Sequence, residues 1–83
     1  MGFVEILGSA KGEGMQLRWE EGFQIHVVIQ GATVTISANR EGLLSLANHL
    51  TALAQEDAGS HIHLDEHNAL EDGSAELILE KSE

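Results

Sequence analysis

The stretch NREGLLSLANHLTALA, residues 39–54, decides the fold of this chain. Asn39 is a good residue for a helix N-cap, and Glu41 in the first turn suits the positive end of the helix dipole. Apolar residues then recur at helical spacing and predict a single apolar stripe made of Leu43, Leu46, Ala47, Leu50, Leu53 and Ala54. His49 lies at the edge of this stripe, where we expect a half-buried structural histidine, and Ser45 lies opposite. One amphipathic helix needs one apolar surface to cover.

Strands supply that surface. Six runs have the pattern expected of strands: residues 3–7, 15–20, 23–30, 33–37, 60–65 and 75–81. Turn signals at Glu21-Gly22 and Gln30-Gly31 make the first four runs an antiparallel meander. Because one helix covers only one face of a sheet, we predict an α+β fold of two layers. One layer is the helix, and the other is a mostly antiparallel sheet of about six strands. The element order is ββββαββ, and the second face of the sheet is open or buried by a partner.

The expected core lies between the helix and the sheet. Leu46, Leu50 and Leu53 should pack on the inward residues of the strands, which are Val27, Ile29, Val34, Ile36, Ile62 and Leu64. In residues 15–20, Met15, Leu17 and Trp19 share one face, which predicts a core position for the only tryptophan.

Length and charge limit the function. Eighty-three residues make one domain, residues 1–83. Four basic and fourteen acidic residues give a net charge of -10, so nucleic acid and anionic membranes are poor partners. A positively charged protein is the natural complement, although acidity also serves solubility alone. The chain has no cysteine, no apolar stretch of the roughly 20 residues that span a membrane, and no basic region before its first apolar run. We therefore expect a soluble, cytoplasmic protein.

The stretch SHIHLDEH, residues 60–67, raises the question of a metal site. In a strand, His61, His63 and Asp65 point to one side and the intervening apolar residues to the other, and His26 should share the open face. A metal site would need a third or fourth ligand from Asp65, His67 or His26. The polar face of a strand predicts the same pattern, so we expect no cofactor and no tight zinc binding. A metal-binding or pH-responsive domain built on His61, His63 and Asp65 remains the alternative function.

Catalysis has less support in the sequence. Ser60, His63 and Asp65 could be nominated as a triad, but neighbours on one flat strand cannot form the required hydrogen-bonded relay. The glycines of residues 12–14 are followed by neither a third glycine nor a Lys-Ser/Thr pair, so a phosphate-binding loop is not indicated. We predict that the protein is not an enzyme.

Three motifs in a fixed order carry a family resemblance. They are SANREGLLSLA at residues 37–47, HIHLD at 61–65 and LEDGSAEL at 70–77. Over about residues 35–81 the chain resembles the immunity protein 32 family of bacterial polymorphic-toxin systems. The resemblance implies a small cytoplasmic protein that binds and neutralises a cognate toxin domain. It transfers no catalytic residues, because an inhibitor needs none.

The expected partner surface combines this resemblance with local charge. Asp65, Glu66, Glu71 and Asp72 fall within eight residues that contain no Lys or Arg. A loop of this kind concentrates negative potential and suits a basic toxin domain. We therefore predict that these four carboxylates, together with His61 and His63, bind the partner. A homodimer through the open sheet face is left open by the sequence.

Overall fold

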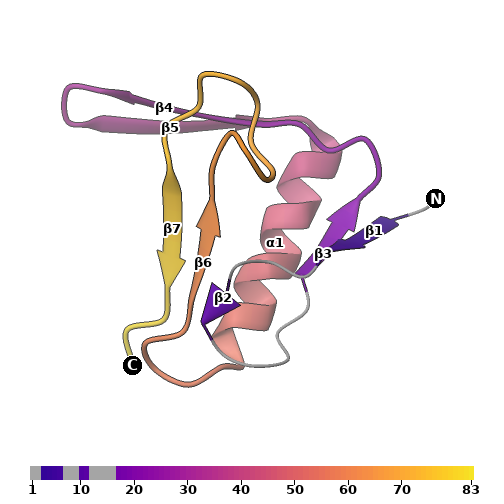
Figure 1. Cartoon of the computed structure of the whole chain (residues 1–83), viewed down its shortest axis with the longest axis vertical. Coiled ribbons are helices and arrows are strands. Elements are labelled where there is room, and N and C mark those ends of the chain that lie inside the picture. The colour runs from indigo at the N-terminus through magenta and orange to yellow at the C-terminus, as the bar shows by residue number, and fades with distance from the viewer. Residues whose placement is uncertain (1–2, 7–9, 12–16) are drawn as a thin grey trace.

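The computed structural model describes residues 3–6, 10–11 and 17–83, and these contain one helix and seven strands (Figure 1). In chain order the elements are β1 (Phe3–Ile6), β2 (Ala10–Lys11), β3 (Leu17–Glu20), β4 (Ile25–Gln30), β5 (Thr33–Ala38), α1 (Arg40–Ala54), β6 (His61–Leu64) and β7 (Leu77–Glu80). Every strand pair is antiparallel. The predicted α+β class with a single helix is confirmed. Among the described residues, no helix has the length and apolar character needed to cross a membrane.

Within the described ranges, the strands form three small sheets instead of the one sheet that we predicted. Their strand orders are β1-β3, β2-β6-β7 and β4-β5. The β4-β5 hairpin is confirmed, with Gly31 at a φ of 59° in its turn. The predicted pairing of β3 with β4 is wrong, because the chain turns away at Gly22, whose φ is 84°, and β3 pairs with β1. The expected inward position of Met15 lies outside the described residues.

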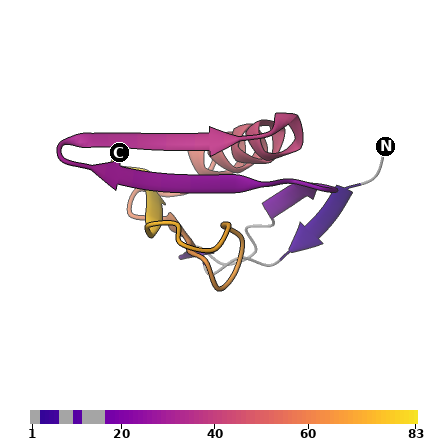
Figure 2. The ribbon, with the colours of Figure 1, turned by 90° about the horizontal axis from the view of Figure 1, so that it is seen from above.

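The hairpin lies across one end of the molecule, above β6, β7 and the start of α1, and its turn projects beyond them (Figures 1 and 2). The core gathers where these elements meet. Its buried apolar residues are Leu17, Trp19, Ile25, Val27, Leu46, Leu53, Ile62, Leu64 and Leu70. The predicted core positions of Leu46, Leu53, Trp19, Ile62 and Leu64 are thereby confirmed, as is that of Val27. The end of the hairpin extends past this core, so the prediction was wrong for Ile29, Val34 and Ile36, which are exposed.

The helix presents a different face to the core than its leucines predict. The buried helix residues are Gly42, Ser45, Leu46, His49 and Leu53, while Leu43 and Leu50 are 55% and 52% exposed. The cause is the close approach of the backbone around β3 and β4. A Cβ on Gly42 would lie 2.5 Å from the carbonyl oxygen of Gln24, and the Ser45 hydroxyl accepts a 2.7 Å hydrogen bond from the Glu20 N–H. Small and polar residues allow this approach, whereas a row of leucines would not.

Side chains fix both ends of α1. Asn39 is the N-cap, as predicted: its Oδ1 accepts hydrogen bonds from the N–H of Gly42 at 2.8 Å and of Gln24 at 3.0 Å. Its Nδ2 donates to the Gly22 carbonyl, so the cap also holds the turn before β4. At the other end, the Lys81 ammonium donates to the carbonyls of Ala54 and Glu56, where a cation suits the negative end of the helix dipole.

Candidate functional site

The outward side of β6 and β7 carries the two histidines, as predicted. Ile62 and Leu64 are buried, whereas the rings of His61 and His63 lie on the opposite side with centroids 5.6 Å apart. Pairing with β7 brings further residues to this side, because His61 lies opposite Glu80 and His63 opposite Ile78. We call this surface the open face; it consists of His61, His63, Glu76, Ile78 and Glu80.

Glu76 and Glu80 were missed as site residues. Glu76 contacts the cluster directly, with its Oε2 3.3 Å from the Nδ1 of His63. The signal was present in the sequence: Leu77 and Leu79 alternate with Glu76, Ile78 and Glu80, so inward leucines place these residues outward. The open face is therefore partly acidic as well as histidine-bearing.

The structure does not bring a third metal ligand from the described residues to His61 and His63. The prediction that His26 shares the open face was wrong, since His26 belongs to β4 and thus to another sheet. Asp65 instead accepts a 2.8 Å hydrogen bond on its Oδ1 from the His67 N–H. Within the part of the chain that the structure describes, no group of three His, Asp or Glu side chains could hold a metal ion.

His49, on the helix, belongs to the core. Its ring is fully buried, not half-buried as expected, and it meets the Trp19 ring edge-on at a centroid distance of 4.1 Å. Burial lowers the pKa of His49 from 6.5 to about 4, and the backbone of Arg18 partly opposes this shift. Neither imidazole nitrogen has a hydrogen bond of good geometry among the described residues. His49 is thus a neutral core residue at pH 7 and takes no part in the exposed site.

The loop between β6 and β7 holds the four predicted carboxylates, and we call residues 65–72 the acidic loop. Two of the four shape it. The Asp65 Oδ1 accepts a hydrogen bond from the His67 N–H at 2.8 Å, and the Glu66 Oε2 accepts one from the Gly73 N–H at 2.9 Å. Glu71 and Asp72 are exposed at the far end of the loop. The four carboxylates therefore divide into a structural pair, Asp65 and Glu66, which accept hydrogen bonds from the loop backbone, and an outer pair, Glu71 and Asp72, at the exposed end of the loop.

The acidic loop is anchored to the rest of the fold. Leu70, only 5% exposed, packs into the core. The following segment runs along the edge of β4: the N–H of Glu71 donates to the Ile25 carbonyl and that of Ala75 to the Val27 carbonyl, both at 2.8 Å. These contacts anchor the backbone that carries Glu71 and Asp72.

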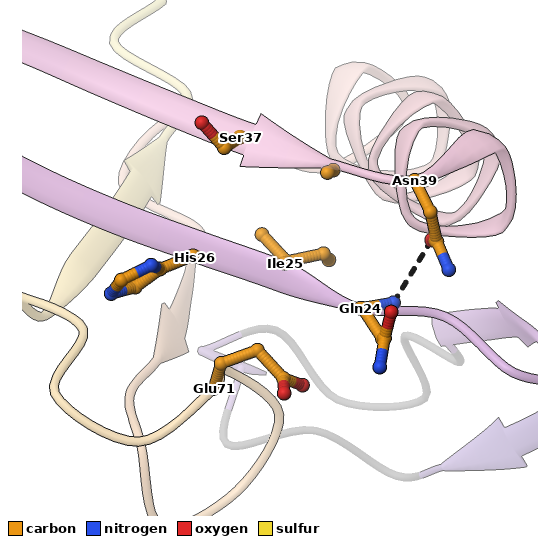
Figure 3. A pocket seen from close by; sticks show the side chains of 7 residues that line it. Gln24, Ile25, His26, Ser37, Asn39 and Glu71 are labelled. Carbon is orange, nitrogen blue, oxygen red and sulfur yellow. Dashed lines mark hydrogen bonds between the residues drawn. The ribbon is translucent and has the colours of Figure 1, made fainter.

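A shallow hollow of about 340 Å³ lies beside the loop, at the base of the hairpin. Figure 3 shows that its walls come from three segments, with His26 on β4, Ser37 on β5 and Glu71 on the loop. Gln24, Ile25, Ala38 and Asn39 complete the lining. His26 therefore shares this hollow with Glu71 of the loop and lies on a different sheet from His61 and His63.

These features define a small acidic α+β domain whose exposed polar surface includes a carboxylate-rich loop and a histidine-bearing strand face. A family model, Immunity protein 32, matches residues 33–82, more than half of the chain, and includes the helix, the acidic loop and the open face. The chain belongs to the immunity protein 32 family, as its motifs indicated. No curated protein and no solved structure matches it.

Proposed function

We propose that this chain is an immunity protein that binds and neutralises a cognate toxin domain with a basic surface, in the cytoplasm where such a toxin would act. Membership of the immunity protein 32 family supports the general role. The net charge of -10 supports the basic character of the partner, since opposite fields speed encounter. Neutralisation by covering the toxin requires neither a catalytic group nor a cofactor of the inhibitor.

The observation that carries the proposal is the anchored acidic loop. A flexible loop would lose conformational freedom on binding, whereas this one is already held by Leu70 and by its hydrogen bonds to β4. Asp65 and Glu66 keep its shape, which leaves Glu71 and Asp72 free to meet cations of the partner. His61 and His63 on the neighbouring open face extend the contact surface.

Coexpression with the product of the adjacent gene, as the candidate toxin, tests this function. The two chains should copurify, and the immunity protein should restore growth to cells that express the toxin. Replacing Glu71→Gln and Asp72→Asn together should weaken both effects. A matched control, Glu56→Gln with Asp57→Asn, removes the same charge from another acidic pair just after α1, at the opposite end of the molecule from the loop (Figure 1). Failure to copurify and to protect would contradict the proposed role.

A further inference from the structure

The β4-β5 hairpin is unlike the rest of this acidic chain. Residues 22–39 contain no Asp, Glu, Lys or Arg. The hairpin nevertheless exposes large apolar side chains, among them Ile29 and Val34 at 58% each and Ile36 at 40%. Exposed strand edges in proteins are commonly protected by charges or by proline, and neither is present here.

The outer edge of β5 is open. Among the described residues, β5 pairs only with β4, while the other edge of β4 is occupied by residues 71–75, which begin at the end of the acidic loop. The Asn39 N–H donates to the Gln24 carbonyl, so these two residues form a hydrogen-bonded pair across the hairpin. In an antiparallel hairpin every second residue pair is of this kind, and the backbone groups of the pairs in between point away from the partner strand. This alternation directs the backbone N–H and C=O groups of Val34 and Ile36 outward, away from β4.

We propose that this edge pairs with the same edge of a second copy of the chain and forms a symmetric dimer. A twofold axis at Thr35 places Val34 opposite Ile36 of the partner, and Thr35 opposite its own copy. The backbone groups of Val34 and Ile36 then bond across the axis, and their apolar side chains lie together on one face. The result is a four-stranded antiparallel sheet with β-branched neighbours at its centre, a favourable arrangement for cross-strand pairs.

Charge favours a second copy at this edge and not at any acidic surface. The acidic loop lies on the β4 side of the hairpin, away from the β5 edge (Figure 2). In the dimer the two loop segments are separated by five strand spacings, roughly 24 Å. That distance exceeds the Debye length of about 8 Å at physiological salt, so their repulsion is largely screened. The hairpin turn also projects beyond the helix, and the axis therefore places the two bodies on opposite sides (Figures 1 and 2). Both acidic loops stay free for the toxin.

Thr35→Lys tests the dimer, because it places two ammonium groups directly opposite each other at the axis. Sedimentation equilibrium of the free protein should show a reversible dimer, and Thr35→Lys should weaken association by roughly tenfold or more. Val28→Lys is the matched control: Val28 lies opposite Thr35 in the hairpin but one strand further from the axis. It should associate like the parent, and a mixture of Thr35→Lys with Thr35→Glu should restore the dimer through an opposite-charge pair.

A cross-link gives a second, independent readout. The chain has no cysteine, so Thr35→Cys should form one disulfide between two chains under mild oxidation, whereas Val28→Cys should not. A parent protein that remains monomeric up to about 1 mM would overturn the proposal. So would a dimer that Thr35→Lys leaves intact, which would place the interface elsewhere, for example on Leu43 and Leu50 of the helix. A variant that loses toxin binding while the parent shows no self-association would assign the edge to the toxin and likewise overturn it.

Discussion

Polar residues serve opposite purposes in two regions of this molecule. In the seam between α1 and the β3–β4 backbone, Ser45 and His49 are buried, and Gly42 allows the helix to approach the backbone of Gln24 closely. In the acidic loop, Glu71 and Asp72 are exposed to solvent. The seam gives up leucine packing on one side of the helix to bring backbones together, whereas the loop keeps its charges available for a partner.

The comparison separates stability from binding. Changes in the seam should lower the free energy of unfolding, while the folded fraction associates with the toxin as before. Changes at Glu71 and Asp72 should leave unfolding nearly unchanged and slow association, since exposed carboxylates contribute little to stability. The predictions below test each side of this division.

The largest expected effect comes from Leu53, the more deeply buried of the two core leucines of the helix. Leu53→Ala should lower the free energy of unfolding by about 2–5 kcal/mol, because Leu53 is only 5% exposed and its truncation leaves a cavity. Leu50→Ala, at a position 52% exposed, should cost less than about 1 kcal/mol. Urea unfolding of the two variants measures the difference. Equal losses would mean that the seam does not set the face of the helix.

His49 should give stability a specific pH dependence. Its pKa falls from 6.5 in the unfolded chain to about 4 in the fold, so its contribution is complete above pH 6.5 and is lost as the pH falls toward 4. The full loss is on the order of 3 kcal/mol. His49→Leu should be at least as stable as the parent at pH 7, because both imidazole nitrogens are buried without good hydrogen bonds among the described residues.

Urea unfolding at about pH 7 and pH 5 compares the parent with His49→Leu. The parent should lose more stability between these pH values than the variant does. Parallel losses would show that burial of His49 does not shift its titration.

Gly42→Ala tests the close approach in the seam. Alanine normally favours a helix interior by about 1 kcal/mol over glycine. Here the added methyl would meet the Gln24 carbonyl oxygen at 2.5 Å and the Ile25 side chain at 2.9 Å, so we expect a net loss of about 1–3 kcal/mol. Thermal unfolding measures this loss. A stabilised variant would show that helix and hairpin can separate without cost.

The smallest effects distinguish the two kinds of loop carboxylate. Glu66→Ala should lower stability by about 0.5–1 kcal/mol, because it removes the acceptor for the Gly73 N–H. Glu71→Ala should change stability by less than about 0.5 kcal/mol. Chemical unfolding with replicate titrations measures both. A larger loss for Glu71 than for Glu66 would reverse the assignment of the structural pair and the outer pair.

The sequence predicted the helix and its N-cap but not its rotation about its own axis. The leucine stripe and the buried stripe share Leu46 and Leu53, and they differ in the choice between Leu50 and His49. Hydrophobicity favours the leucine. The structure buries His49 instead, because Glu20 and Gln24 approach the helix closely. This contact joins distant segments, so the pattern of apolar residues within the helix does not predict it.

In the candidate site, too, local features could be predicted from the sequence, and features that depend on distant segments could not. Alternation placed His61 and His63 correctly, because the side of a strand is a local property. The carboxylates were found as a cluster, but the roles of Asp65 and Glu66 depend on how the loop folds back on Gly73 and β4. The position of His26 required knowing which strands share a sheet, a long-range matter that turn signals did not resolve.

The most direct test of the central claim is the association rate of this protein with its cognate toxin domain, measured at low and at physiological salt. The proposed role predicts that Glu71→Gln with Asp72→Asn slows association roughly fivefold at low salt and flattens its salt dependence. Glu56→Gln with Asp57→Asn should have a clearly smaller effect. Association that is independent of salt and unchanged by loss of Glu71 and Asp72 would contradict electrostatic recognition by the acidic loop.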